Sequence, residues 1–236
     1  EELRPSTRRE RGELARTDRY KTLANVINSI THEIKGPLTA LIGYNHALPQ
    51  KLDDREFLSR FSEIFKKEIT KIKELIENLS NYSQPAPLSL ERTNIIKLIN
   101  DTLDMLKDKF MDCKVNIYKY YDDKFAFDIS IDSQQIRQAL LNILFNALEA
   151  MPQGGQIWIG AEQQGHEFHI SISDAGCGIA PEHLTRIFDP FFKLKRENRG
   201  LGLSVVQSII ESHGGRIDVE SEVDGGTEFV IKLPVA

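Results

Sequence analysis

The sequence predicts an α+β protein in which an antiparallel helical hairpin precedes an α/β sandwich domain. In the first third of the chain, apolar residues recur three and four positions apart, which is the period of an amphipathic helix. Beyond a proline-containing segment, helical runs alternate with short runs of β-branched and aromatic residues bounded by glycines. We therefore expect a helical domain over 18–82, a linker over 83–90 and a mixed domain over 91–236. The charged residues 1–17 form either a solvated end or the tail of a helix that carries a signal from upstream.

Composition describes an ordinary soluble globular chain of one large or two modest domains, with 40% hydrophobic and 28% charged residues among 236. A net charge of −5 gives no general reason to expect a nucleic-acid partner. The two cysteines, Cys113 and Cys177, match no metal-binding spacing and indicate reduced thiols in a cytoplasmic setting. No apolar run reaches the ~18 residues that span a bilayer. Membrane contact is expected only through a missing N-terminal region, if there is any.

A first helix is predicted from about Asp18 to Ala47, ending before Pro49. His32 falls on its polar side, so the imidazole is exposed, and the adjacent Glu33 provides a base for a nucleophilic histidine. Pro37 removes a backbone hydrogen bond and is expected to bend the helix. Taken alone, this stretch is better described as an ordinary surface histidine on an amphipathic helix.

A second helix is predicted to begin near Asp53–Asp54, whose acids suit a helix N-terminus, and to form a hairpin with the first. A single hairpin of this size buries its apolar stripes poorly. We therefore expect a homodimer through residues 18–82, in which two hairpins form a four-helix bundle. The stripe of the second helix consists of Leu58, Phe61, Phe65, Ile69, Ile72, Ile76 and Leu79.

The mixed domain is expected to hold three main helices and six strands, interleaved without strict βαβ alternation. This order favours a sandwich with the helices on one face of the sheet. Asp132 or Ser133 is expected to cap the central helix. The expected helices are 94–110, 134–151 and 201–213, and the expected strands are 115–121, 125–131, 156–162, 167–173, 216–222 and 227–233.

An asparagine pair in the central helix is the first of four features that point to a nucleotide. Asn142 and Asn146 lie four residues apart on one helix face, where their amide oxygens can reach a hard cation such as Mg²⁺. Their apolar flanks, residues 140–141 and 143–145, predict that this helix is largely buried. Two asparagines on a helix surface are an equally simple interpretation.

Two glycine-containing segments are the second and third features. In Asp174–Ile179, an aspartate that follows a strand can accept a hydrogen bond from an exocyclic amine, and the glycines let backbone approach a ring or phosphate. Gly200–Ser204 opens a helix whose free amides suit a phosphate. The second segment is neither a P-loop nor a dinucleotide-binding fingerprint, and ordinary glycine turns remain open for both segments.

The fourth feature is Phe188–Phe192, followed by Lys193, Lys195, Arg196 and Arg199. Exposed-loop aromatics beside several cations suit a mobile lid over a phosphate chain. A solvated run of charges is the alternative.

Taken together and in order, these segments resemble the successive motifs of two-component sensor histidine kinases. The resemblance covers roughly residues 18–236. It implies a dimerisation and histidine-phosphotransfer hairpin, followed by an ATP-binding domain of the type shared with gyrase and Hsp90. The matching segments are Thr31–Thr39, Asn142–Ala150, Asp174–Ile179, Phe188–Phe192, Gly200–Leu203 and Gly225–Thr227.

The resemblance also implies roles for particular residues, with ATP and Mg²⁺ as cofactors. His32 would be autophosphorylated with Glu33 as general base and Lys35 near the transferred phosphoryl group, which then passes to an aspartate of a response regulator receiver domain. Asn146 would hold Mg²⁺ with support from Asn142, where an amide in place of a glutamate favours phosphotransfer over hydrolysis. Asp174 would bind the adenine amine. The other implied ATP-binding residues are Gly176, Gly178, Ile179, Phe191, Phe192, Lys195, Gly200, Leu201, Gly202, Leu203 and Thr227.

The chain departs from the family pattern in two places. Gly36 stands where Thr or Asn often positions water for dephosphorylation of the regulator, so the resemblance implies a weak phosphatase. Asn198 and Arg199 stand where Gly and Thr are usual, which either stiffens the lid or adds a phosphate contact. The alternative functions are a catalytically silent dimeric docking module (a pseudokinase) and a phosphorelay intermediate that takes phosphate from another protein.

Overall fold

The computed structural model describes residues 31, 34–83, 88–122, 126–190, 192 and 202–235. The chain divides into two compact units, Glu1–Leu79 and Ser80–Ala236. The first is a helical hairpin and the second a mixed α/β sandwich, which confirms the predicted α+β class.

Around its turn the hairpin has the helix ends that its sequence predicts, while the predicted start of the first helix at Asp18 lies outside the described residues. Its first helix is described over residues 34–47 and runs into a 3₁₀ turn, η1 (Leu48–Gln50), which contains Pro49. The second helix, α2 (Arg55–Ser83), follows a short turn. The Asp54 carboxylate accepts a hydrogen bond from the Phe57 amide at 2.9 Å and so caps α2.

The hairpin buries only part of its apolar surface between its own two helices. The Tyr44 ring lies 5.9 Å from the Phe57 ring and 6.2 Å from the Phe61 ring, measured between centroids. Other apolar residues of both helices stay more than two-fifths exposed within one chain, so the hairpin leaves an apolar face partly uncovered. These exposed residues are Leu38, Ile42, Phe65, Ile69 and Ile76.

The second unit contains a five-stranded sheet in the order β2-β4-β5-β7-β6 and a separate two-stranded sheet, β1-β3. Strand β2 pairs parallel with β4, and every other pair is antiparallel. The strands are β1 (Glu91–Asn94), β2 (Val115–Tyr120), β3 (Asp128–Ile131), β4 (Gly155–Gln164), β5 (Glu167–Asp174), β6 (Arg216–Glu222) and β7 (Gly226–Pro234).

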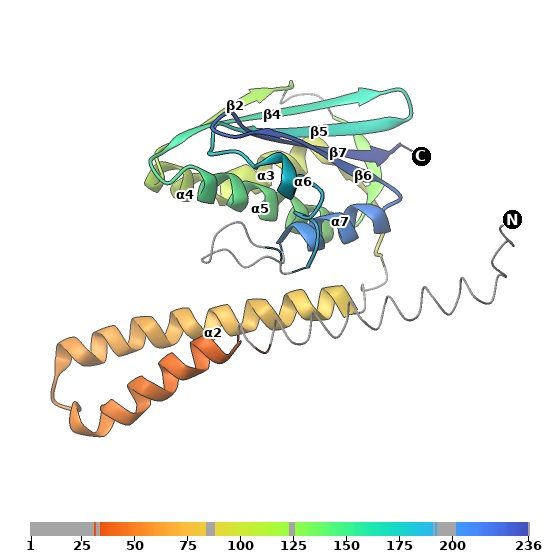
Figure 1. Cartoon of the computed structure of the whole chain (residues 1–236). Helices are drawn as coiled ribbons and strands as arrows, with labels where there is room; N and C mark the ends of the chain where they lie inside the picture. Colours follow the sequence, from red (N-terminus) through yellow and green to blue (C-terminus); the bar gives the residue numbers. More distant parts are fainter. Residues whose placement is uncertain are drawn as a thin grey trace, which may run out of the picture. The chain divides into compact units, whose positions relative to one another are not determined.

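The helices of this unit lie on one face of the five-stranded sheet, as predicted (Figure 1). They are α3 (Ile95–Met105), α4 (Lys107–Asp112), α5 (Ser133–Ala150), α6 (Pro181–Leu184) and α7 (Gly202–Ser212). The Asp132 carboxylate accepts a hydrogen bond from the Gln135 amide at 3.0 Å and caps α5. Gly214, with a φ of 71°, ends α7 in the left-handed conformation that glycine adopts most readily.

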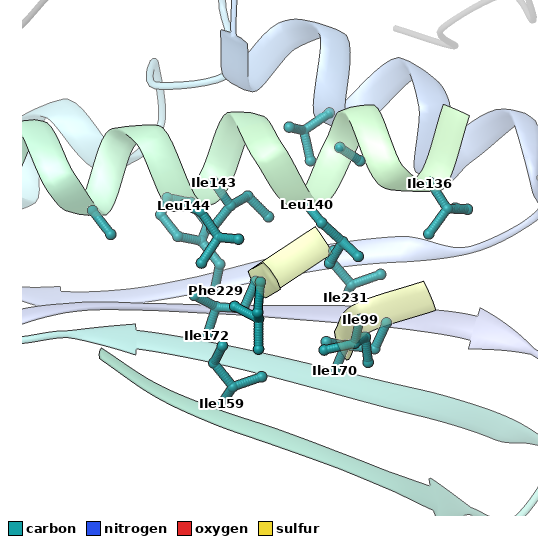
Figure 2. Close-up of a cluster of buried hydrophobic side chains, with 14 of the residues drawn as sticks. Ile99, Ile136, Leu140, Ile143, Leu144, Ile159, Ile170, Ile172, Phe229 and Ile231 are labelled. Carbon is teal, nitrogen blue, oxygen red and sulfur yellow. The ribbon is translucent and has the colours of Figure 1, made fainter. Parts of the chain in front are cut away.

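The core of the unit forms where α5 packs on the sheet. Figure 2 shows that the α5 side chains point toward residues of β4, β5 and β7. The α5 residues recur three and four apart, while the strand residues alternate, so each element presents one apolar face. At most 4% of any of these side chains is exposed: Ile136, Leu140, Ile143, Leu144, Ile159, Ile170, Ile172, Phe229 and Ile231.

The structure corrects several expected elements. The helix expected over 94–110 is two helices, because the backbone of Leu106 (φ −100°, ψ 3°) leaves the helical conformation although the apolar period continues. The strand expected over 125–131 is only Asp128–Ile131 among the described residues. The helix that carries Asn142 was expected to be largely buried, yet its Phe145 is 42% exposed, because this residue lies on the side of α5 away from the sheet. Two short elements that were not predicted, β1 and α6, are four residues each and carry no periodic signal.

Candidate nucleotide-binding site

Asn142 and Asn146 lie on a side of α5 that does not face the sheet. The Asn142 side-chain nitrogen is buried and has no hydrogen-bond partner among the described residues. A Cβ atom added to Gly202, the first residue of α7, would lie 3.7 Å from the Asn142 side-chain oxygen. The structure thus brings together the asparagine pair and the glycine start of α7, two motifs 56 to 60 residues apart in the sequence. Because an unsatisfied buried amide costs about 1–3 kcal/mol, this nitrogen is a candidate donor to a ligand that binds beside the start of α7.

Asp174 is the last residue of β5 and is only 6% exposed. Its carboxylate accepts a hydrogen bond from the Gly176 amide at 2.8 Å. Burial raises the pKa of Asp174 to about 6, although the backbone amides of Gly176 and Thr227 favour the ionised form. A buried carboxylate held in this way can accept a hydrogen bond from an N–H group of a ligand.

Thr227 of β7 is the cross-strand partner of Asp174 on one side and of Ser221 on the other. The hydroxyl oxygens of Thr227 and Ser221 are 2.8 Å apart, and the Ile179 amide donates to Ser221 Oγ at 2.8 Å. Two predicted site residues, Ile179 and Thr227, therefore meet through Ser221, and Asp174 pairs with Thr227 on its other side. The sequence did not single out Ser221, because it reads as one polar position of an alternating edge strand.

Two glycines allow the loop after β5 to lie against the turn between β6 and β7. Gly178 has a φ of 65°, and a Cβ atom there would lie 1.8 Å from the Glu222 carbonyl oxygen. Gly226 has a φ of 95°, and its Cβ would lie 1.9 Å from the Asp174 carbonyl oxygen. Side chains at either position are excluded, so both glycines are needed for this close backbone approach.

Gly176 meets the end of α5. A Cβ atom at this position would lie 2.6 Å from the Ala150 Cβ and 2.6 Å from the Asp174 carboxylate. The Cys177 amide donates to the Ala150 carbonyl at 3.3 Å. The loop is thus fixed to α5, the same helix that carries Asn142.

Phe188 and Phe192 are only partly exposed and pack against the core, which corrects the expectation of exposed-loop aromatics. The Phe192 ring lies 5.5 Å from the His183 ring, and the Arg186 guanidinium carbon is 4.7 Å from its centroid. These contacts attach the start of the expected lid to α6. Phe191, Lys195, Gly200 and Leu201 lie outside the described residues.

The expected phosphoacceptor segment belongs to the first helix. His32 and Glu33 lie outside the described residues, while Lys35 and Gly36 are exposed and Pro37 is buried. The Thr39 hydroxyl donates to the Lys35 carbonyl at 2.7 Å. The segment after His32 therefore presents Lys35 and Gly36 to solvent.

Comparison with known proteins identifies both units. Residues 22–87 match the family model of the His Kinase A (phospho-acceptor) domain, and residues 131–236 match that of the histidine kinase-, DNA gyrase B- and HSP90-like ATPase. The chain therefore belongs to the sensor histidine kinases, whose catalytic core consists of these two domains. The second match makes the unit around Asp174 an ATP-binding domain, and the first implies dimerisation.

Particular relatives agree with this assignment. The chain is 34% identical over 226 residues to the signal transduction histidine-protein kinase AtoS of Escherichia coli (strain K12). It is 30% identical over 223 residues to the sensor histidine kinase ZraS of the same organism. Each match covers 94% of this chain, but only 36% of AtoS and 48% of ZraS, so the chain spans half of these relatives or less.

A solved structure of histidine kinase ThkA in complex with the response regulator protein TrrA matches 97% of this chain and 66% of the ThkA chain. The TM-score is 0.78 at 26% sequence identity. In the part of the chain that the structure describes, no helix is both long and apolar enough to cross a membrane.

Proposed function

We propose that this chain is an ATP-dependent protein-histidine kinase that phosphorylates its own His32 and transfers the phosphoryl group to an aspartate of a response regulator receiver domain. The observation that carries the proposal is the buried Asn142 side-chain nitrogen, which has no hydrogen-bond partner among the described residues and lies on a side chain beside Gly202, in the same unit as the buried Asp174. A ligand with a phosphate chain at one end and an amine-bearing base at the other satisfies both.

The base end of ATP is assigned to the loop after β5. Asp174 accepts a hydrogen bond from the adenine amine, next to Thr227. Gly176, Gly178 and Ile179 shape the surface against which the ring lies. The phosphate end is assigned to Gly200–Leu203, because the N-terminus of a helix such as α7 attracts an anion. Phe191, Phe192 and Lys195 belong to the lid over it.

Magnesium fits the residues at this site. Among the described residues there is no group of three or more His, Cys, Asp or Glu side chains that could hold a metal ion. Mg²⁺ therefore depends on oxygens of the nucleotide phosphates and water, with the Asn146 amide oxygen as the protein ligand and Asn142 in support. When bound, the ion neutralises charge on the phosphate chain.

The reaction at His32 requires positioning and charge neutralisation more than covalent chemistry by the protein. A ring nitrogen of His32 forms the bond to the γ-phosphorus, the bond to the ADP oxygen breaks, and Glu33 takes the imidazole proton. Lys35, which is exposed, supplies positive charge three residues from His32. An amide at Asn142 cannot act as a general base for water, which favours transfer to His32 over hydrolysis.

The helical domain, assigned to residues 18–82, is proposed to form a homodimeric four-helix bundle. The uncovered apolar face of the hairpin supports this, because pairing two copies removes the face from water. A linker over 83–90 then leads to the catalytic domain over 91–236, and residues 1–17 belong to an extension. We assign the core to the cytoplasm, where a receiver domain is its partner and no nucleic acid is bound.

Labelling with γ-labelled ATP tests the proposal. Wild-type protein with Mg-ATP is expected to become a phosphoprotein that is labile in acid and stable in base, and His32→Ala is expected to abolish the label. His46→Ala is the matched control, because His46 is an exposed histidine of the same helix and its loss should leave the label intact. ATP binding without label would indicate a silent docking module. Label acquired only from a phosphorylated partner would indicate a phosphorelay intermediate.

A further inference from the structure

A serine on the edge strand β6 determines how the hydroxyl of Thr227 is oriented. Asp174, Thr227 and Ser221 occupy paired positions on three adjacent strands, β5, β7 and β6. Side chains of directly paired residues lie on the same face of a sheet. The Ser221 hydroxyl therefore lies on the far side of Thr227 from the Asp174 carboxylate.

The hydrogen bonds of Ser221 leave one arrangement of protons that satisfies all of them. A serine hydroxyl has one hydrogen to donate and two lone pairs that accept. The Ile179 amide donates to Ser221 Oγ, and the Gly226 carbonyl, which is 2.8 Å away, can only accept. The single Ser221 hydrogen is therefore committed to Gly226. The remaining contact, 2.8 Å from Thr227 Oγ1, requires that Thr227 donates.

Thr227 consequently has only its lone pairs left for a ligand. Its neighbour Asp174 is also an acceptor when ionised, and both residues are only 6% exposed. In a poorly solvated site, an acceptor that faces another acceptor is costly, because water cannot replace the missing donor. The pair therefore favours a ligand group that donates hydrogen bonds.

We propose that Ser221 is a positioning residue that holds Thr227 as a hydrogen-bond acceptor and thereby makes the site select a purine with an exocyclic amine over a purine with an exocyclic oxygen. This inference rests on the proposed function, which assigns adenine to Asp174 and Thr227. The adenine amine has two N–H donors to offer, whereas the oxygen of hypoxanthine would face two acceptors. Without the Ser221 hydroxyl, Thr227 can rotate its hydrogen toward the base and tolerate that oxygen.

The test compares the binding of ADP and inosine diphosphate to the full chain by calorimetry. Wild-type protein is expected to prefer ADP, and Ser221→Ala is expected to lower the ratio of the two affinities by about tenfold, the effect of one hydrogen bond. A partly unfolded variant still gives a valid ratio, because the folded fraction scales both affinities equally. Ser221→Thr keeps the hydroxyl and should keep the wild-type ratio.

Two further variants separate positioning from a general structural effect. Ser173→Ala is the matched control, because Ser173 is partly exposed on β5 but alternates to the opposite face from Asp174. It should leave the ratio unchanged. In a Thr227→Val background, Ser221→Ala should change the ratio no further, because its effect acts through the Thr227 hydroxyl.

An unchanged ratio in Ser221→Ala would overturn the inference, as would a change that adds to that of Thr227→Val. Wild-type protein that binds both nucleotides equally would also overturn it, while the ATP site itself would stand. Wild-type protein that binds no ADP would overturn the proposed function and the inference with it.

Discussion

The buried carboxylate of Asp174 is expected to lower the stability of the folded protein when it is ionised. Burial raises its pKa from 3.8 to about 6 in the folded state. Well below pH 3.8 the group is protonated in both the folded and the unfolded chain, so it does not change the free energy of unfolding. Above pH 6 the folded chain must hold a poorly solvated charge, which lowers the free energy of unfolding by up to about 3 kcal/mol, since each pKa unit corresponds to about 1.4 kcal/mol.

Asp174→Asn removes this charge and keeps an oxygen that can accept from the Gly176 amide. The stability advantage of the variant over wild type is therefore expected to grow by up to about 3 kcal/mol between about pH 4 and about pH 7.5. Denaturant unfolding at fixed protein concentration measures it. In the same variant, ADP affinity should fall by about tenfold or more, because a hydrogen bond to a charged group is lost.

The matched control, Asp128→Asn, removes a carboxylate from an exposed strand position of the same unit. It should leave ADP affinity unchanged. The reasoning is refuted if the advantage of Asp174→Asn over wild type is the same at both pH values, or if it shrinks as the pH rises.

Four glycine substitutions give further predictions. Gly43→Ala should raise the free energy of unfolding by about 0.5–1 kcal/mol, because a Cβ atom there meets nothing within 4 Å and glycine disfavours a helix. Gly178→Ala should cost about 3 kcal/mol or more and abolish ADP binding, because its Cβ would overlap Glu222. Gly165→Ala, at a similar φ of 62° but in open space, should cost only about 1 kcal/mol. Gly36→Asn should speed dephosphorylation of the regulator about tenfold or more by positioning water, and its exposed helix site has room for the side chain.

Each of these predictions has a contrary result. Equal losses of stability at Gly178 and Gly165 would show that the contact with Glu222 is not what requires glycine. A lower stability in Gly43→Ala would show that this helix position packs against something in the dimer. Efficient dephosphorylation by wild type, with no gain in Gly36→Asn, would refute the interpretation of Gly36 as the cause of weak phosphatase activity.

The sequence predicted the long elements of the fold because their signals are local. The apolar residues of α5 recur three and four positions apart, so the helix predicted over 134–151 can be identified from neighbouring positions alone. The break at Leu106 and the strand β1 could not be predicted in this way, because they depend on tertiary packing and on pairing with a distant strand. Phe145 is a further example, because the type of a residue alone does not show which side of its helix packs against the rest of the protein.

At the candidate site, the sequence predicted the residues that stand in recognisable motifs, such as Asp174 and Gly202. It could not show that Gly202 lies beside Asn142, because only the packing of α7 on α5 creates that contact. Nor could it identify Ser221, whose importance depends on hydrogen bonds to two segments that the sheet brings together. The sequence therefore does not show which distant residues lie next to one another in the folded protein.

The most direct test of the central claim is to locate the phosphoryl group by mass spectrometry after incubation with Mg-ATP. We predict phosphate on His32 in wild-type protein and, at an ATP concentration well below saturation, about tenfold less or lower still in Asp174→Asn, because ATP bound by the second unit is the phosphate donor. Phosphate on another side chain, or equal phosphorylation of His32 in Asp174→Asn, would contradict the central claim.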